Sequence, residues 1–313
     1  EPHIVEALDD VNRLFDYREE ARAILGDNLP LRTPSFCTGC PERPIFSALK
    51  IMQKELGQAH ISADIGCHTF AALPPFNVGN TVMGYGLGLA SSAGLSPNFD
   101  KRVISIMGDG GFWHNGMSSG VAAAQANGND SILLVVKNGY TSATGWQLLP
   151  SSLRDRYGNK REMSIERVLK SFGVSWLKTV RSYSIARMLK VLREAMTTTE
   201  GGLKVIIADG ECQLARQRRV RTEVAERISQ GRRDVRTRFG VDEDLCTGDH
   251  SCIRLSGCPS LTIKPSTDPL RTDPVAHIDN DCVGCGTCGE VAHAAVLGPS
   301  FYEARIIRNA NLF

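Results

Sequence analysis

Ten cysteines are the residues of this sequence whose type and spacing most clearly offer chemistry. Cys37 and Cys40 are separated by two residues, and Cys282, Cys285 and Cys288 repeat that spacing. In a chain without a secretion signal, cysteines at this spacing favour metal binding over disulfide bonds. Four thiolates can hold either zinc or an iron–sulfur cluster, so the ligand type alone leaves the metal open.

A second group of polar residues lies where two expected strands end. The apolar run 103–107 leads directly into Gly108, Asp109 and Gly110. The next apolar run is followed by Asn138. Neighbouring parallel strands end at the same edge of a sheet, which is where open α/β sheets bind their ligands. The acidic and amide side chains are therefore expected to face one site.

These residues suit a hard cation and a phosphate group. Asp109, Asn138 and the backbone carbonyl of Tyr140 would offer three oxygens, and Mg²⁺ completes its octahedron with phosphate and water. Gly108 and Gly110 let the backbone approach the phosphates, whose charge the N-terminus of the following helix would favour. The alternative is an ordinary Gly-Asp turn followed by an unrelated asparagine turn.

The elements that would position these residues follow a parallel α/β pattern, in which short β-branched runs alternate with helical stretches. We expect strands over residues 61–65, 103–107, 132–137, 174–179 and 204–208. We expect the intervening helices over residues 45–56, 82–93, 117–127, 165–172 and 184–196.

The composition changes on both sides of this region. Residues 1–35 combine a polar helix over 11–25 with a linker marked by prolines. Residues 36–213 form the α/β domain. Residues 214–313 start with an arginine-rich linker and continue as a segment rich in Cys, Pro, Asp and Gly. A small domain of this kind needs a metal or disulfide bonds to fold.

The overall composition excludes several classes of protein. With 313 residues, 42% of them hydrophobic, the chain is too long and too apolar to be disordered. A net charge of +2 argues against general nucleic-acid binding. No apolar run approaches the roughly 20 residues that cross a bilayer, and the N-terminus lacks a signal peptide. We expect a cytoplasmic protein, and Glu1 as first residue indicates a processed chain or a fragment.

The order of the motifs resembles a known family. Gly108-Asp109-Gly110, a long spacer and Asn138 resemble the thiamine diphosphate and Mg²⁺ motif of thiamine enzymes. The accompanying motifs are Phe36-Cys-Thr-Gly-Cys40-Pro41, Asp64-Ile-Gly-Cys67-His68 and Gly210-Glu-Cys212. Over residues 36–313 this order resembles the 2-oxoacid:ferredoxin oxidoreductases, and among them the indolepyruvate:ferredoxin oxidoreductases. The resemblance implies a parallel-sheet thiamine diphosphate-binding fold with a small ferredoxin-like C-terminal domain.

In that family four cysteines hold a [4Fe–4S] cluster beside the thiamine ring. Carried over by position, the resemblance implies the ligands Cys37, Cys40, Cys67 and Cys212. Two positions depart from the family pattern. Glu42 stands where a histidine is more typical, so no role is inferred for it. Lys137 precedes Asn138 where the family often has Asp or Asn, which removes one polar contact.

His68 and His114 are the candidate catalytic residues. A neutral imidazole titrates near the working pH, so either could polarise the substrate or move a proton. The alternative for both is a hydrogen-bonded histidine at a strand end.

The tail cysteines resemble those of bacterial ferredoxins. Cys258, which precedes a proline, and the C-x₂-C-x₂-C run would together hold one [4Fe–4S] cluster through Cys258, Cys282, Cys285 and Cys288. In a companion run, Asp249 stands between Cys246 and Cys252 where a second cysteine would be expected, and the matching Cys-Pro reads Gly298-Pro299. We expect the second cluster to be absent, three-iron or labile.

The resemblance implies oxidative decarboxylation of an aryl 2-oxoacid such as indolepyruvate to an acyl-CoA, with electrons passed to ferredoxin. The implied cofactors are thiamine diphosphate, Mg²⁺ and [4Fe–4S] clusters. The implied partners are ferredoxin, the 2-oxoacid, coenzyme A and a pyrimidine-binding domain or subunit. Since no such domain is readable in the sequence, the chain should be inactive alone, and we expect a dimer or larger assembly.

Two other functions stay open on the residues alone. A non-redox thiamine-dependent decarboxylase or carboligase with zinc-bound cysteines would be colourless and stable in air. A non-enzymatic electron-carrier or zinc-binding module would have no affinity for thiamine diphosphate.

Overall fold

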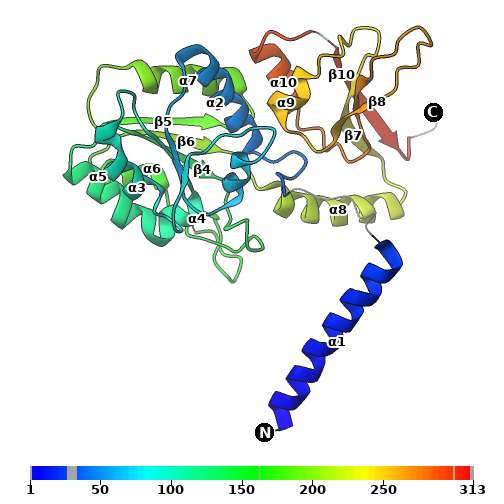
Figure 1. Cartoon of the computed structure of the whole chain (residues 1–313), viewed down its shortest axis with the longest axis horizontal. Coiled ribbons are helices and arrows are strands. Elements are labelled where there is room, and N and C mark those ends of the chain that lie inside the picture. The colour runs from blue at the N-terminus through cyan, green and yellow to red at the C-terminus, as the bar shows by residue number, and fades with distance from the viewer. Residues whose placement is uncertain (1, 27–33, 162, 299, 311–313) are drawn as a thin grey trace. The chain divides into compact units, whose positions relative to one another are not determined.

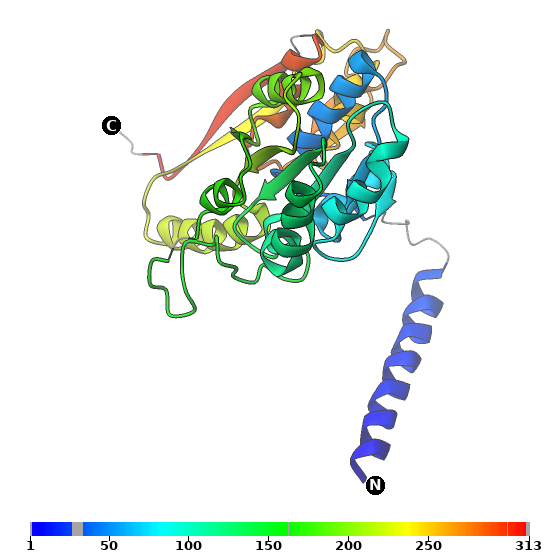
Figure 2. The same cartoon turned by 90° about the vertical axis from the view of Figure 1, so that its left-hand side faces the viewer.

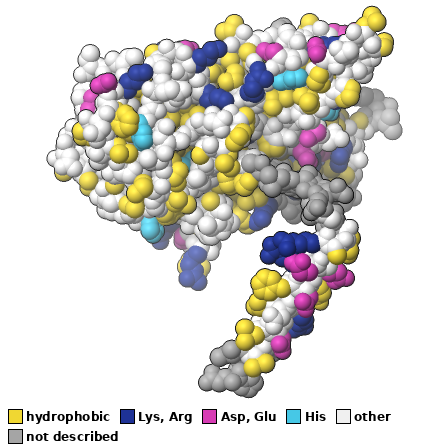
Figure 3. Space-filling model, viewed as in Figure 1, with side chains coloured by type: hydrophobic (Ala, Val, Ile, Leu, Met, Phe, Trp, Pro, Cys, Tyr) yellow, Lys and Arg dark blue, Asp and Glu magenta, His cyan; other side chains and the backbone are white. Residues whose placement is uncertain are grey.

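The structure is a computed structural model that describes residues 2–26, 34–161, 163–298 and 300–310. The chain divides into two compact units, residues 1–34 and 35–313. The first unit contains α1 (Pro2–Leu25), which starts well before the expected residue 11 and carries hydrophobic and charged side chains along its surface (Figure 3). None of the described helices combines the length and hydrophobicity needed to cross a membrane.

The second unit is built on a six-stranded parallel sheet with helices on both faces (Figures 1 and 2). The strand order is β2-β1-β3-β4-β6-β5. The strands are β1 (Ile61–Ala63), β2 (Thr81–Val82), β3 (Ile104–Gly108), β4 (Ile132–Lys137), β5 (Trp176–Arg181) and β6 (Lys204–Asp209). The connecting helices are α2 (Arg43–Leu56), η2 (Cys67–Ala72), α3 (Gly88–Leu95), η3 (Ser96–Asn98), α4 (Asp109–Gly111), η4 (Phe112–Val121), α5 (Ala122–Ala126), α6 (Ile165–Ser171) and α7 (Ile185–Thr197).

Alternating residues of the central strands supply two hydrophobic cores, one on each face. Leu134 of β4 and Ile206 of β6 pack with α2 and α7, whereas the adjacent Leu133 and Val205 pack with α6 and η4. This alternation follows from the two-residue period of a strand. Because both faces are covered, the strands read as continuous apolar runs in the sequence. The predicted α/β class is confirmed.

All five expected strands are present, with their ends shifted by at most two residues. The helix expected over 82–93 is wrong in its first part. Residue 82 belongs to the short edge strand β2, and the helix α3 starts only at residue 88. Gly86 has a φ of +80°, a left-handed conformation that a continuous right-handed helix does not allow.

The helix expected over 117–127 is largely a π-helical segment, η4, which starts at residue 112 and continues into α5. π-Helical turns are rare and occur frequently at functional sites. Here the segment follows directly on the Gly-Asp-Gly tripeptide.

The C-terminal part contains two antiparallel strand pairs, short helices and a small core in which cysteines take part. The pairs are β7 (Asp234–Val241) with β10 (Phe301–Arg308), and β8 (Leu261–Lys264) with β9 (Val275–Ile278). The helices are α8 (Gln213–Ser229), α9 (Ser251–Ser256) and α10 (Thr287–Ala294). Cys246 packs with Leu261 and Val275 in the core of this part.

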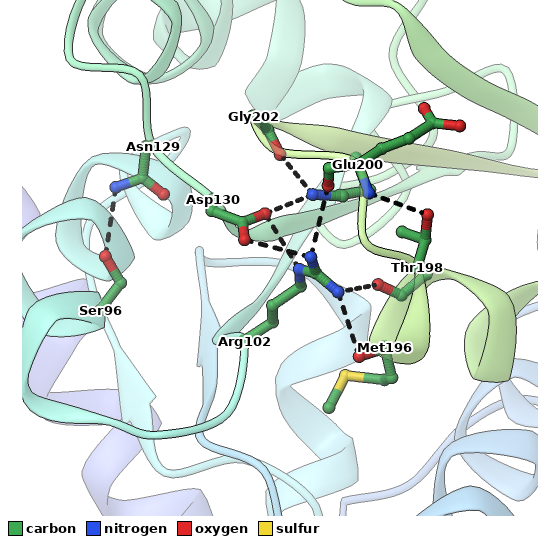
Figure 4. Close-up of polar contacts among 10 residues, drawn as sticks. Ser96, Arg102, Asn129, Asp130, Met196, Thr198, Glu200 and Gly202 are labelled. Carbon is green, nitrogen blue, oxygen red and sulfur yellow. Dashed lines mark hydrogen bonds and ion pairs between the residues drawn. The ribbon is translucent and has the colours of Figure 1, made fainter.

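A network of ion pairs and hydrogen bonds around Asp130 lies at the amino edge of the sheet (Figure 4). Lys204 is fully buried and donates to the Asp130 carboxylate and to the Gly202 carbonyl oxygen at 2.9 Å. Arg102 donates to the same carboxylate, with its Nε 2.9 Å from Asp130 Oδ1. Asp130 is therefore the counter-charge of a buried ammonium.

Replacing Asp130 by Ala should lower the free energy of unfolding by about 3 kcal/mol, because it leaves a buried lysine charge without a partner. Urea unfolding followed by circular dichroism measures the change. Asp100→Ala, at an exposed position, serves as the control. Equal losses in the two variants would contradict the role of Asp130.

Candidate functional site

A cavity of about 280 Å³ lies at the carboxyl edge of the sheet, beyond the ends of β1, β3 and β4. Residues far apart in the sequence meet there because the strands are parallel and end at one edge. Seven of the predicted site residues line this cavity: Cys67, His68, Gly108, Asp109, Gly110, Asn138 and Tyr140.

Asp109 lies at the floor of the cavity, with 1% of its surface exposed. Its Oδ2 accepts hydrogen bonds from the backbone N–H of Asn138 at 3.1 Å and of Gly139 at 2.7 Å. Its Oδ1 accepts from the N–H of Gly110 at 3.0 Å. Burial raises the pKa of Asp109 to about 7, even though these three N–H groups favour the charged form.

Asn138 lies beside Asp109, so the two residues separated by 28 positions in the sequence do share one site. Its Oδ1 accepts from the N–H of Tyr140 at 3.1 Å and from Ser142 Oγ at 3.0 Å. Its Nδ2 donates to Glu42 Oε1 at 3.3 Å. These contacts orient the side-chain amide, with its oxygen toward the loop after β4 and its nitrogen toward Glu42.

The two glycines after Asp109 lie where neighbouring side chains approach the backbone too closely for a Cβ atom. A Cβ on Gly110 would overlap the hydroxyl of Tyr85 and lie 2.6 Å from Thr141 Oγ1. A Cβ on Gly111 would overlap the carboxylate of Asp64. Only glycine therefore fits at these two positions, where the chain turns from β3 into the following helical segment.

Glu42 is a site residue to which the sequence reasoning gave no role. It is 3% exposed, it lines the cavity, and its Oε2 has no hydrogen-bond partner among the described residues. Burial raises the pKa of this carboxyl. The only signal in the sequence was its unusual position after Cys40-Pro41. An unsatisfied buried carboxyl oxygen facing a cavity indicates that a ligand group completes its contacts.

His68 is held at the cavity wall by Asp64, a second residue that the sequence reasoning missed. His68 Nε2 lies 2.6 Å from Asp64 Oδ1, and both side chains are buried. Asp64 Oδ2 also accepts from the N–H of Gly86 at 2.9 Å. Burial opposes the charged form of His68, but Asp64 and, more weakly, Glu42 raise its pKa above the usual value.

His114, the other predicted catalytic histidine, lies outside the cavity lining and is exposed. Its ring lies 5.1 Å from the ring of Tyr85, which does line the cavity. His114 is thus separated from the site by one side chain, and its catalytic role stays a prediction.

The first cysteine set gathers next to the cavity. Cys67 lines the cavity, and burial raises the pKa of its thiol to about 12. The N–H of Cys40 donates to the Cys37 carbonyl at 3.0 Å, so these two share one turn. The N–H of Cys212 donates to the Asn138 carbonyl oxygen at 3.0 Å, which ties this set to the strand end after β4.

Four of the six tail cysteines line one small cavity: Cys258, Cys282, Cys285 and Cys288. Burial, followed by the charges of Cys285, Cys258 and Cys282, raises the pKa of Cys288 to about 12. The N–H of Gly284 points at Cys282 Sγ at 3.4 Å. Four sulfur donors around one cavity form the donor set that a [4Fe–4S] cluster requires.

The companion run lines a separate cavity with Cys246, Asp249 and Cys252. Gly298 lies at this cavity, where a fourth cysteine is lacking, and Pro299 lies outside the described residues. The Asp249 carboxylate accepts from Ser251 Oγ at 2.8 Å and is exposed. These contacts engage Asp249 within its own loop.

Within the described part of the chain, no three His, Cys, Asp or Glu side chains are already arranged to hold one metal ion. The cysteines therefore adopt the positions of free thiols. Their assignment as ligands stays a prediction that rests on shared cavities and on donor chemistry.

Known proteins provide an independent comparison. The family model described as the C-terminal TPP-binding domain of thiamine pyrophosphate enzymes matches residues 64–208. This range contains Asp64, His68, Asp109 and Asn138. The chain is also similar to a solved 2-oxoglutarate:ferredoxin oxidoreductase from Magnetococcus marinus, with a TM-score of 0.51 and 19% identity over 60% of this chain and 69% of that one. This likeness concerns the fold alone.

Curated relatives share more of the sequence. Indolepyruvate oxidoreductase subunit IorA of Thermococcus kodakarensis is 29% identical over 84% of this chain and 40% of its own length. The subunit of the same name from Pyrococcus abyssi is 29% identical over 88% of this chain and 42% of its length. The chain thus spans less than half the length of these relatives. Over most of its own length the chain is similar to these subunits, and residues 64–208 match the thiamine pyrophosphate-binding domain, in agreement with the resemblance that its motifs indicated.

Proposed function

We propose that this chain provides the diphosphate–Mg²⁺ site and iron–sulfur ligands of an enzyme that oxidatively decarboxylates an aryl 2-oxoacid to an acyl-CoA. The observation that carries the proposal is the meeting of Asp109, Asn138 and Cys67 at one cavity within the matched domain. The shared name of the relatives, indolepyruvate oxidoreductase, supports an aryl substrate.

Asp109 and Asn138 would hold Mg²⁺, with the carbonyl of Tyr140 as a third oxygen. Gly110 and Gly111 would accommodate the diphosphate, since a side chain at either position would collide with its neighbours. Thiamine diphosphate supplies, when bound, the carbanion chemistry that removes CO₂ from a 2-oxoacid. The protein's part is to hold the cofactor at the sheet edge and to exclude competing ligands from Asp109.

His68 would act at the wall of the same cavity. Asp64 fixes the ring of His68 and favours its charged form. A charged imidazole can donate a proton or a hydrogen bond to a carboxylate or carbonyl oxygen of the substrate. Glu42, whose Oε2 has no hydrogen-bond partner among the described residues, lines the same cavity as His68.

The cysteines would carry the electrons away. Cys67 lies at the cavity, and its set would hold the cluster nearest the site of chemistry. The tail set would hold the next cluster. Two electrons per substrate would leave one at a time by this route, and ferredoxin would accept them.

A second subunit or domain completes the proposal. The chain spans only 40% to 42% of the two relatives' lengths, and we expect a pyrimidine-binding part in the remainder of those relatives or in a partner subunit. The chain alone should therefore bind thiamine diphosphate without turning over a 2-oxoacid. Turnover of a 2-oxoacid by the isolated chain would contradict the proposal that a second subunit or domain is required.

An arginine-lined cleft supports ferredoxin as the electron acceptor. The cleft has a volume of about 520 Å³ and includes Cys282 and Gly284 of the tail run among its lining residues. The arginines in it are Arg216, Arg221, Arg227, Arg236, Arg238 and Arg308. Asp234 pairs with Arg227 at 3.3 Å and with Arg236 at 3.0 Å. The remaining positive charge would attract an acidic protein close to the tail cluster.

Arg221→Glu should weaken binding of an acidic bacterial ferredoxin to the iron-loaded chain by about tenfold at low salt, because it reverses a charge in the cleft. Arg187→Glu makes the same charge change on the exposed face of α7 and should have little effect. Binding is measured by calorimetry at several salt concentrations. Equal weakening by both variants would place ferredoxin elsewhere.

Anaerobic purification followed by iron, sulfide and thiamine diphosphate analysis tests the proposal as a whole. A brown protein that contains iron and sulfide and binds thiamine diphosphate with Mg²⁺ is the expected result. Zinc in place of iron, with cofactor binding retained, would instead identify a non-redox thiamine-dependent protein. Iron or zinc without any affinity for the cofactor would identify an electron-carrier or interaction module.

A further inference from the structure

Arg43 is a charged residue buried between two cysteine-bearing loops. It is fully buried at the start of α2, directly after the first cysteine pair. Its Nε donates to the carbonyl oxygen of Cys37 at 3.3 Å, and its Nη1 donates to the carbonyl oxygen of Ser256 at 3.2 Å. Ser256 lies two positions before Cys258. The guanidinium therefore joins the first cysteine set to the tail.

Among the described residues, no carboxylate forms an ion pair with this guanidinium. Its Nη2 has no hydrogen-bond partner in the described part of the chain. A buried charge without a counter-charge strongly destabilises a folded chain. A negative group that the bare chain does not present is therefore needed beside Arg43.

Cysteine sulfurs are the groups available to supply that negative charge. Arg43 donates hydrogen bonds to the backbone of Cys37 and of Ser256, which lies two positions before Cys258. Metal binding deprotonates thiols, and four thiolates around a cluster leave a net negative charge.

The two cysteine-bearing regions are also in direct contact. A Cβ on Gly39, between the first two cysteines, would overlap Val283 of the tail run. Thr38 Oγ1 lies 3.2 Å from Ser260 Oγ. Ser47 of α2 donates to the carbonyl oxygen of Leu255 at 2.7 Å. Arg43 thus sits within a packed contact between the two regions.

We propose that Arg43 is a positioning residue that serves as the shared counter-charge of two iron–sulfur clusters, one in each cysteine set, and raises the reduction potential of the tail cluster. The inference rests on the proposed function and deepens it. A positive charge stabilises the more negative, reduced state of a nearby cluster. Each electron would leave the reduced first cluster, which becomes oxidised, and enter the tail cluster, which becomes reduced.

The test compares Arg43→Met, which removes the charge, with Arg43→Lys, which keeps it. Both chains are reconstituted anaerobically with iron and sulfide, and the cluster potentials are measured by redox titration with electron paramagnetic resonance. Arg43→Met should lower the tail potential by about 59 mV, which is a tenfold change in its reduction equilibrium. Arg43→Lys should stay close to wild type. Arg187→Met, at an exposed position, is the control for loss of a distant charge.

The outcomes separate this inference from the proposed function. Clusters in the wild type with an unchanged tail potential in Arg43→Met would overturn the role of Arg43 alone. A lysine variant that behaves like the methionine variant, or failure of both to load iron, would show that shape rather than charge matters and would also overturn it. Loading of the lysine variant but not the methionine variant would support it. A wild type that binds no iron would overturn both proposals.

Discussion

Replacing Asp109 by Asn should weaken the binding of thiamine diphosphate in the presence of Mg²⁺ by at least about 100-fold, or about 3 kcal/mol. The substitution keeps the shape of the side chain and removes the charge that would face the cation. It also places an NH₂ group against one of the three backbone N–H donors that Asp109 now satisfies. Calorimetric titration of the chain with the cofactor measures the loss.

The control for this variant is Asp100→Asn, a change of the same chemistry at an exposed position. Both variants should give circular dichroism spectra like that of the wild type. Equal affinity in Asp109→Asn and wild type would remove Asp109 from the cofactor site, and with it the central step of the proposed function.

The same titration should depend on pH in a defined direction. In the free chain the pKa of Asp109 is raised to about 7 by burial, so its carboxyl is protonated below that pH. Since a cation requires the carboxylate, binding must release that proton, and the affinity should fall by about tenfold per pH unit below 7 and level off above it. The free energy of unfolding of the free chain depends on pH in the opposite direction. The contribution of Asp109 to stability is fully present below the pKa that this carboxyl has in the unfolded chain. It is lost as the pH rises through 7, the pKa in the folded chain.

The meeting of Asp109 and Asn138 could be predicted from the sequence because it depends only on strand identity and direction. Each residue follows an apolar run, and parallel neighbours end at one edge whatever the loops do. The first part of the segment 82–93 could not be predicted in the same way. Its apolar residues suit a helix, but residues 81–82 pair with Ser62 and Ala63 of β1, and that pairing is a tertiary contact. The sequence likewise gives no indication that Gly86 has a positive φ.

The burial of Glu42 and Arg43 could not be predicted from the sequence for a related reason. Charged residues are rarely fully buried, so two adjacent ones at a helix start are expected to face solvent. Only the folded chain places Glu42 against Asn138 and Arg43 against Ser256, which is 213 positions away. Their partners come from the loop after β4 and from the tail. A local pattern contains neither contact.

Replacing single tail cysteines should change the iron content of the chain, and the tail offers both a test position and a matched control. Cys288→Ser should lower the iron content of the reconstituted chain from about eight to about four atoms, because it removes one of four ligands of a [4Fe–4S] cluster. Cys246→Ser should leave the iron content unchanged, since Gly298 and the engaged Asp249 leave the companion run short of ligands.

Iron and sulfide are measured after anaerobic reconstitution, together with the thermal unfolding of each variant. Cys288 and Cys246 are both cysteines of the tail that pack in or against its small core, so a general packing defect would affect both variants alike. Loss of iron in Cys288→Ser alone would also lower the unfolding temperature of the tail, because the small core there depends on the metal. Equal loss of iron in both variants would contradict a specific role of Cys288 as a cluster ligand.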